Sequence, residues 1–356
     1  MAKKMKAQVF YEAENMKLEE LEIPELGPDE ALVQVKACGI CGSDLEYYFG
    51  RSPVGTPTGK GPIVLGHEFT GVIAELGSAG KKLFKEGDRV VVNPVQNCNA
   101  CRACLSGKTN LCTSIYVPGV TANGAFAEYC VSKYTGLVPL PDNLSFEEGA
   151  FTEPLACAAY GMKKLEIRPG QFVVISGPGP LGLMMVQLAK SIGAGKVALV
   201  GTRDYRLEKG KELGADYIFN VKEKNSPHYV KNLKEAISDL TGGRLADRAI
   251  VPSSSNDAFE QAIDITGNAA IIVHFGLPGE KDVIHVPALS THTMDKEIRF
   301  SWLAPLMWPT TLDILANGLV KVKPLLTHSY PLEQTEGAIR AVQDREGNVI
   351  KAQIKP

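Results

Sequence analysis

Residues 172–193 read FVVISGPGPLGLMMVQLAKSIG, an apolar run, a glycine-rich turn and a second apolar run that is rich in helix-forming residues. A further apolar run, KVALVG, follows at 196–201. Strand, turn, helix and strand in this order form one βαβ unit, and such units build parallel sheets. The stretch therefore predicts an α/β domain with a doubly wound parallel sheet.

The turn at 177–182 has the spacing G-x-G-x-x-G, which binds a dinucleotide when it follows a strand and opens a helix. In that role Gly177 permits the tight turn, Gly179 lets the pyrophosphate approach the backbone, and Gly182 lets helix and strand pack closely. Pro180 and Leu181 would begin the helix whose N-terminus faces the phosphates. The alternative is a plain turn without a ligand.

The end of the second strand bears on the choice between NAD and NADP. An acid that binds the adenosine ribose is expected there, but the chain has Gly201, Thr202 and Arg203. Without that acid a 2′-phosphate is not repelled, and Arg203 could pair with it. This favours NADP, while the neighbouring Asp204 keeps NAD open.

Outside this unit the chain changes character twice. The alternation of helices and strands continues to about residue 295. Residues up to about 150 instead read as an all-β domain of short strands broken by glycine and proline. After 295 the rhythm is lost, apart from a helix-like stretch at 308–319 and a charged tail ending in a strand-like run at 348–354.

Length and composition exclude several classes of protein. The chain has 356 residues, which suits two domains, and its net charge of −2 does not suggest a nucleic-acid or anionic-membrane partner. The N-terminus lacks the apolar run of a signal peptide, and no stretch approaches the roughly 18 apolar residues of a membrane span. We therefore expect a cytoplasmic protein with a small-molecule substrate.

Four of the eight cysteines crowd into one segment with the spacing C-x2-C-x2-C-x7-C. Four thiolates satisfy tetrahedral zinc and leave no open position, so Cys98, Cys101, Cys104 and Cys112 predict a structural zinc. The alternatives are an iron–sulfur cluster and four reduced surface cysteines.

A second set of possible metal ligands is dispersed along the chain: Cys41, His67, Glu68 and Glu153. A thiolate, an imidazole and carboxylates make a mixed site, and mixed sites usually keep a position open for water or substrate. Spacing alone does not bring these residues together.

The motifs GICGSD (39–44), GHEFTGVIAELG (66–77), the four-cysteine segment, EPLAC (153–157) and GPGPLG (177–182) occur in this order. In this the chain resembles the zinc-dependent medium-chain dehydrogenase/reductase family over essentially its whole length, and most of all the sorbitol and polyol dehydrogenases. The resemblance implies a GroES-like β-barrel catalytic domain at 1–155 and 296–356, with a Rossmann domain inserted at 156–295. It also implies two zinc ions per subunit, and NAD or NADP as cofactor.

The resemblance assigns roles to individual residues. Cys41, His67 and Glu68 would surround the catalytic zinc, and Glu153 would bind it directly or through its water. Ser43 would accept the substrate proton. Many relatives have a histidine three residues after that serine, and this chain has Glu46, whose carboxylate could relay protons instead.

The expected reaction is the reversible NAD(P)-linked oxidation of a secondary alcohol to a ketone. A polyol, a sugar alcohol or a polyol phosphate is the expected substrate, for which Arg51, Lys60 and Arg299 could supply positive charge. Leu303 and Ala304 stand where sorbitol dehydrogenases have an arginine–tyrosine pair. This leaves open a less polar secondary alcohol or a vicinal diol.

Two further expectations concern the class of enzyme and its assembly. A zinc-independent quinone or enone reductase is the more remote alternative on the same fold. The resemblance also implies a homodimer or homotetramer, with 269–275 (AAIIVHF) and 281–286 (KDVIHV) as candidate edges for pairing between subunits.

Overall fold

The computed structural model describes residues 3–52 and 61–356. The chain forms two compact units. The first unit comprises Met1–Ala156, Pro305–Gly318 and Val322–Pro356, and the second comprises Cys157–Ala304 and Leu319–Lys321. No helix in the described part of the chain has both the length and the apolar character needed to cross a membrane.

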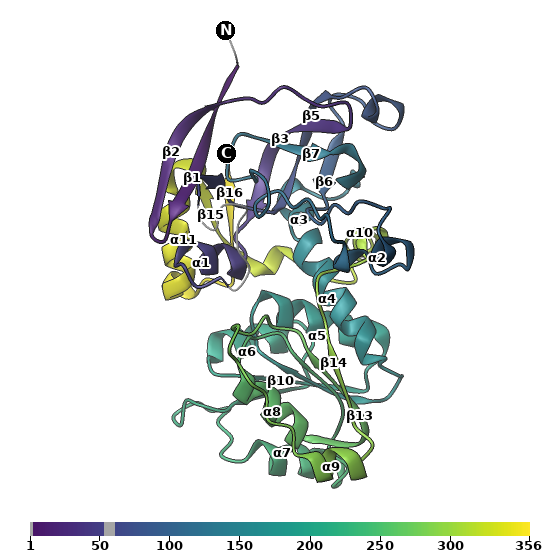
Figure 1. Ribbon diagram of the computed structural model, residues 1–356. Coiled ribbons are helices and arrows are strands. Elements are labelled where there is room, and N and C mark those ends of the chain that lie inside the picture. The colour runs from purple at the N-terminus through teal and green to yellow at the C-terminus, as the bar shows by residue number, and fades with distance from the viewer. Residues whose placement is uncertain (1–2, 53–60) are drawn as a thin grey trace. The chain divides into compact units, whose positions relative to one another are not determined.

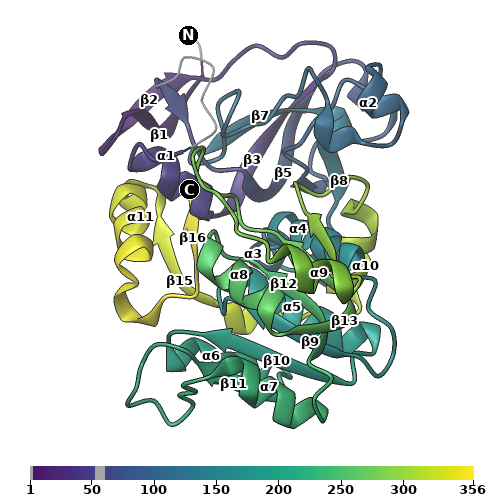
Figure 2. The ribbon, with the colours of Figure 1, turned by 60° about the horizontal axis from the view of Figure 1, so that its bottom comes forward.

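The second unit is built on a parallel six-stranded sheet with the order β11-β10-β9-β12-β13-β14 (Figures 1 and 2). Its strands are β9 (Phe172–Ser176), β10 (Lys196–Gly201), β11 (Tyr217–Asn220), β12 (Ala246–Val251), β13 (Thr266–His274) and β14 (Glu297–Phe300). Its helices are α5 (Pro180–Ile192), α6 (Asp204–Glu212), α7 (Leu233–Thr241), α8 (Asn256–Asp264) and α9 (Ala288–Thr293). The inner strands are continuous apolar runs because helices cover both faces of such a sheet.

The order of this sheet reverses between β9 and β12, since the chain first winds outward through β10 and β11 and then returns to the other side of β9. In doubly wound sheets ligands bind at the carboxyl ends of the strands at this switch point. The glycine turn follows β9 directly, so it lies at that position. The predicted Rossmann sheet is confirmed.

The first unit is mainly β-structure. It holds a seven-stranded sheet, in which β15, β16, β3, β5, β6 and β8 follow one another and β7 also pairs with β3, and a smaller sheet of order β2-β1-β4. Its strands are β1 (Lys4–Glu12), β2 (Asn15–Glu22), β3 (Glu30–Gly39), β4 (Ile63–Val64), β5 (Glu68–Leu76), β6 (Arg89–Val92), β7 (Tyr129–Lys133), β8 (Leu137–Pro139), β15 (Leu326–Pro331) and β16 (Lys351–Lys355). A core of apolar side chains including Val33, Phe69 and Ile354 lies between these strands.

Short helices connect the strands of this unit. They are α1 (Gly42–Tyr48), α2 (Arg102–Leu105), α3 (Phe146–Gly149), α10 (Trp308–Ala316) and α11 (Thr335–Asp344), while α4 (Thr152–Leu165) leads from the first unit into the second. The 3-10 turns are η1 (Gly80–Lys82), η2 (Thr109–Leu111), η3 (Tyr134–Gly136), η4 (Lys323–Leu325), η5 (Leu332–Gln334) and η6 (Glu346–Asn348).

The C-terminal segment is more ordered than the charged tail that the sequence suggested. It contains β15, α11 and β16, drawn in yellow, and β16 pairs with β3 from the N-terminal part of the chain (Figures 1 and 2). Helix α11 buries Ala338, Ile339 and Ala341 and exposes its charged side chains, which is the pattern of an amphipathic helix. The charges that suggested a tail belong to the exposed face of this helix.

The prediction that the runs 269–275 and 281–286 are edge strands was wrong. The run 269–275 lies largely in β13, which pairs on one side with β12 and on the other with β14. The run 281–286 contains no strand. The edge of the six-stranded sheet on this side is β14.

Candidate active site

Cys41 precedes α1 and lies directly after the end of β3. Asp44 makes the turn rigid, because its Oδ2 accepts a hydrogen bond from the Cys41 backbone N–H at 2.8 Å and so caps the helix start. The Asp44 side chain is completely buried. The local sequence C-G-S-D therefore holds the Cys41 thiol in a fixed place.

His67 and Glu68 reach the same place from β5. The register of the sheet pairs Glu68 with Gly39, the last residue of β3. As a result, three donor atoms lie within 4.8 Å of one another, one from each of Cys41, His67 and Glu68. His67 and Glu68 are buried, and Cys41 is half-buried.

These donor atoms fit a zinc ion. The three side chains lie close together and are at least half-buried, so water screens their charges little and a cation is needed to compensate them. Thiolate, imidazole and carboxylate are the ligands that zinc takes, and three protein ligands leave a position for water or substrate. We conclude that the three residues can hold a catalytic zinc.

The surroundings of His67 support this role. His67 Nδ1 lies 3.6 Å from Asp44 Oδ1, and metal-binding histidines typically turn their second ring nitrogen toward a carboxylate. Burial alone would lower the pKa of His67, but the charges of Asp44 and Cys41 outweigh burial and hold that pKa well above its usual value. This strongly negative environment attracts a cation.

Glu153 does not join the group of three within that distance. It is 8% exposed and lies in the first turn of α4. Its charge nevertheless reaches the site, since it contributes to raising the pKa of Lys351. The structure thus brings together three of the four predicted residues, with Glu153 nearby.

The sequence analysis missed Lys351. This buried side chain from β16 lies with its Nζ 2.5 Å from Glu68 Oε2. A single lysine in a terminal strand carries no motif, so only the sheet register reveals it.

The other residues assigned from the resemblance lie on or near α1. Ser43 is half-buried in the first turn, and its hydroxyl makes no hydrogen bond with a described residue. Glu46 is one helical turn further on, where its Oε1 accepts a hydrogen bond from Arg51 at 3.2 Å. The next residue, Tyr47, was given no role from the sequence; it is buried in the core, and burial raises its pKa.

The arginines proposed for substrate charge have partners within the protein. Arg51 also donates to Gln343, and Arg299 is held by Glu166 and Glu297. Lys60 lies outside the described residues. Leu303 is half-buried with a φ of 55°, in the left-handed region.

The four-cysteine segment forms a lobe around α2 and η2. Donor sulfurs of Cys98, Cys101, Cys104 and Cys112 all lie within 4.8 Å of one another. Backbone hydrogen bonds from Cys104 and Thr113 lower the pKa of Cys101 to about 6, which favours the thiolate that binds zinc. The donor set fits a closed zinc site of four thiolates.

The glycine turn has the geometry of a phosphate-binding loop. Gly177 has a φ of 137°, and a Cβ on Gly182 would lie 1.9 Å from the Gly177 carbonyl oxygen. A Cβ on Gly179 would meet nothing within 4 Å, so the backbone at the start of α5 is open to a ligand. Pro180 and Leu181 form the first turn of that helix, which buries its next residues against the sheet.

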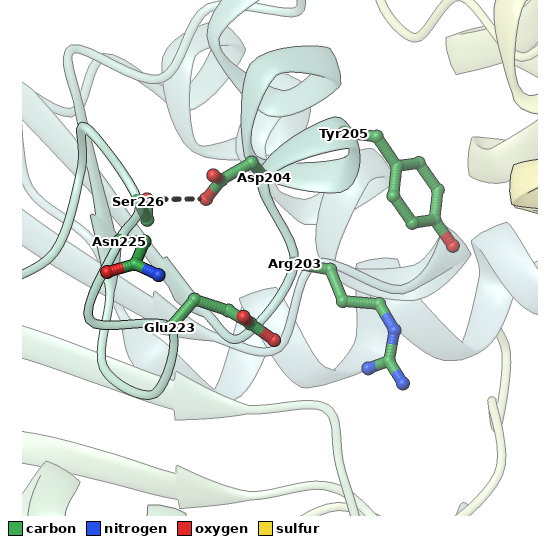
Figure 3. A pocket seen from close by; sticks show the side chains of 6 residues that line it. All are labelled: Arg203, Asp204, Tyr205, Glu223, Asn225 and Ser226. Carbon is green, nitrogen blue, oxygen red and sulfur yellow. Dashed lines mark hydrogen bonds between the residues drawn. The ribbon is translucent and has the colours of Figure 1, made fainter.

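The end of β10 is shaped for the adenosine side of a cofactor. Gly201 is required by packing, since a Cβ there would lie 2.5 Å from Pro178 Cγ. Beyond it, Arg203 and Asp204 line an open pocket whose walls also include Tyr205, Glu223, Asn225 and Ser226 (Figure 3). Thr202 is half-buried between Gly201 and this pocket.

The carboxylate of Asp204 is already engaged by neighbouring side chains of the protein. Its Oδ1 accepts hydrogen bonds from Ser226 Oγ and Asn220 Nδ2, both at 2.7 Å, and these bonds lower the pKa of Asp204. In Figure 3 the carboxylate is turned toward Ser226, while the Arg203 guanidinium extends away from it. Asp204 therefore fixes the loop after β11, and Arg203 and Glu223 are the other charged residues that line the pocket.

Comparison with known proteins agrees with this geometry. Residues 27–142 match the family described as "Alcohol dehydrogenase GroES-like domain", and residues 180–317 match "Zinc-binding dehydrogenase". A sorbitol dehydrogenase of Bacillus subtilis is 34% identical over 355 residues, covering 99% of this chain and 97% of its own.

Two solved structures share the complete fold. A zinc-binding dehydrogenase of Sinorhizobium meliloti, bound to NADP, aligns with a TM-score of 0.90 and 28% identity over 99% of this chain and 100% of its own. An alcohol dehydrogenase of Escherichia coli CFT073, complexed with NADH, aligns with a TM-score of 0.88 and 29% identity over 99% of this chain and 99% of its own.

The chain therefore belongs to the zinc-dependent medium-chain dehydrogenase/reductase family, in the branch of the sorbitol dehydrogenases. It is a dehydrogenase with zinc and a nicotinamide cofactor, and the expected combination of a GroES-like domain with a Rossmann domain is confirmed.

The two metal sites predict different results for two cysteine substitutions. Cys41→Ser should lose the catalytic zinc and activity while the melting temperature changes little, because the site is held by sheet pairing. Cys104→Ser should lose the other zinc and lower the melting temperature, because four thiolates hold a lobe with little core of its own. Elemental analysis measures the zinc content of each variant, and thermal unfolding measures its melting temperature. Full zinc content in Cys41→Ser would contradict the catalytic assignment.

Proposed function

We propose that this enzyme oxidises the secondary hydroxyl of a polyol or sugar alcohol to a ketone, with Cys41, His67 and Glu68 holding the catalytic zinc. The observation that carries the proposal is the convergence of these three donors, two of them buried and one half-buried, within 4.8 Å. The identity to a sorbitol dehydrogenase along nearly the whole chain supports the substrate class.

Electrostatics favour a neutral substrate over a phosphorylated one. A substrate phosphate needs an unpaired cation, and Arg51 and Arg299 already pair with carboxylates. Because Leu303 and Ala304 replace the arginine–tyrosine pair of sorbitol dehydrogenases in the sequence, a vicinal diol or a simpler secondary alcohol is the second candidate.

The reaction needs a proton acceptor and a hydride acceptor. When bound, the zinc would act as a Lewis acid that lowers the pKa of the substrate hydroxyl, and the cofactor would take the hydride. Ser43, two residues after Cys41, is the group that takes the hydroxyl proton. Asp44 orients both Cys41 and His67, and Glu153 adds negative charge next to the site.

The proton must then reach water, and Glu46 provides a route. Residues three apart share one face of a helix, so Glu46 lies on the side of α1 that carries Ser43. Its side chain is 44% exposed, which connects it to solvent. Arg51 holds the carboxylate in place at the end of this path.

The function is tested by following reduced-cofactor absorbance with a panel of polyols, polyol phosphates, vicinal diols and simple secondary alcohols. We expect turnover with neutral polyols or diols that is lost on chelation and restored by zinc. A matched reaction with quinones and enones tests the zinc-independent alternative. Activity that survives removal of zinc from the Cys41 site would overturn the proposal.

The pocket after β10 leads us to propose NADP as the preferred cofactor. No acid ends β10, Asp204 is engaged by Ser226 and Asn220, and no partner for the Arg203 guanidinium is found in the described part of the chain. Glu223 lines the same pocket, and its carboxylate favours NAD because it would repel a 2′-phosphate.

Arg203→Ala separates these cofactors. A charge-assisted contact to the 2′-phosphate contributes about 1.5–3 kcal/mol, so kcat/KM for NADP should fall about 10- to 100-fold while the value for NAD changes little. Lys211→Ala, at the far end of α6, removes the same charge and is the control. An equal fall for both cofactors would contradict a contact to the phosphate.

The open edge of the six-stranded sheet supports a homodimer, or a homotetramer built from such dimers. Among the strands of residues 3–52 and 61–356, β14 pairs with β13 alone, and an exposed edge invites pairing with another chain. Exposed apolar side chains gather in the segment that leads to it and follows it: Leu277, Val283, Val286, Leu289, Phe300 and Trp302. A monomer rarely exposes so many without a partner.

Charges placed in this segment should dissociate the subunits. We expect Leu289→Glu combined with Phe300→Glu to reduce the mass measured by light scattering after gel filtration to that of one chain. Leu83→Glu is the control, since Leu83 is as exposed but lies in the first unit. A wild-type protein that is monomeric, or a double variant of unchanged mass, would exclude this interface.

A further inference from the structure

Lys351 makes an ion pair that is unlike the others in the described residues. Its side chain is 6% exposed and that of its partner Glu68 is 1% exposed, whereas each other lysine or arginine pair has at least one side chain more than a quarter exposed. Lys351 Nζ also donates a hydrogen bond to the Ile40 carbonyl oxygen at 2.9 Å. A lysine is rarely buried unless an opposite charge pairs with it, and here that charge belongs to Glu68.

Close packing fixes both partners of this pair. A Cβ on Gly39 would lie 2.1 Å from Glu68 Oε2 and 3.2 Å from Lys351 Cε. Gly39 itself pairs with Glu68 in β5 and with Gln353 in β16. The Glu68 carboxylate therefore has little freedom to move away from the ammonium group.

The ammonium group faces the anions of the metal site. Lys351 Nζ lies 2.5 Å from Glu68 Oε2, and Glu68 in turn has a donor atom within 4.8 Å of those of Cys41 and His67. Lys351 is therefore a positive charge placed next to the position where the zinc would be held.

We propose that Lys351 is a positioning residue that holds one carboxylate oxygen of Glu68 and so limits how strongly Glu68 binds the catalytic zinc. This inference rests on the proposed function of Cys41, His67 and Glu68 as zinc ligands. With one oxygen held by Lys351, only the other remains for the metal, and the positive charge offsets part of the negative charge of the ligands.

The physical consequence concerns both the affinity and the reactivity of the site. A buried carboxylate that loses its counter-charge interacts more strongly with the nearest remaining cation, which here is the zinc. The repulsion between the lysine ammonium and the zinc is lost at the same time. Removing the charge of Lys351 should therefore tighten zinc binding. Because stronger binding by an anionic ligand makes the zinc a poorer Lewis acid, the same change should slow turnover.

The test uses the complete two-zinc protein and three variants of Lys351. Lys351→Gln keeps a hydrogen-bond donor without charge, Lys351→Met removes both, and Lys351→Arg keeps both. Lys355→Met is the matched control, since Lys355 lies on the same strand and pairs with Glu147 at the surface. The readouts are zinc affinity by chelator competition, the visible spectrum after cobalt substitution, and kcat and KM separately.

We expect Lys351→Gln and Lys351→Met to bind the catalytic zinc more tightly by on the order of tenfold, because a repulsive unit charge a few ångströms from the metal position is removed. Their cobalt spectra should change and kcat should fall, while KM for the cofactor stays the same. Lys351→Arg should restore affinity and spectrum, and Lys355→Met should match the wild type. Weaker or unchanged zinc binding in both neutral variants would overturn the proposal.

Glu68→Gln keeps the proposal testable if both neutral variants fail to fold. If Lys351 limits the contribution of Glu68, this substitution should weaken zinc binding by less than about tenfold, far less than His67→Ala. An equal loss in both variants would overturn the role of Lys351. A catalytic zinc that survives Cys41→Ser would instead refute the site itself, so the two failures are distinguishable.

Discussion

The pairing of β3 with β5 on one side and with β16 on the other is the constraint on which the metal site depends. At the end of β3, Gly39 is opposite Glu68 in one neighbour and Gln353 in the other. This register places Cys41, just beyond the strand, next to His67 and Glu68. A shift by one residue would turn Glu68 to the opposite face of the sheet and dissolve the site.

The two metal sites are assembled by opposite means. Four cysteines within 15 residues wrap an ion locally, and their backbone N–H groups supply part of the environment that favours thiolates. The donors of the proposed catalytic site instead come from segments that only the sheet brings together. A site of the second kind can be open on one side, because rigid strands rather than the metal hold its ligands in place.

The same distinction explains what could be predicted from the sequence. The glycine turn and the four-cysteine segment are each a short continuous stretch of sequence, so their chemistry could be predicted without knowing the fold. Cys41, His67 and Glu68 could be grouped only through a family resemblance, because their spacing carries no geometric information. Lys351 and the partners of Asp204 had no motif at all, and β14 became recognisable as the edge strand only once the order of the sheet was known.

Lys351 and Asp204 also show why residue type alone misleads near a binding site. Asp204 stands beside the position of a ribose-binding acid, yet two hydrogen bonds turn it toward its own loop. Lys351 resembles a surface lysine in sequence, yet it is buried among carboxylates. Buried ion pairs contribute little net stability, because desolvation offsets the attraction between the charges. Stability is therefore a weak reason for the Lys351–Glu68 pair, and its contact with a metal-site residue is the stronger one.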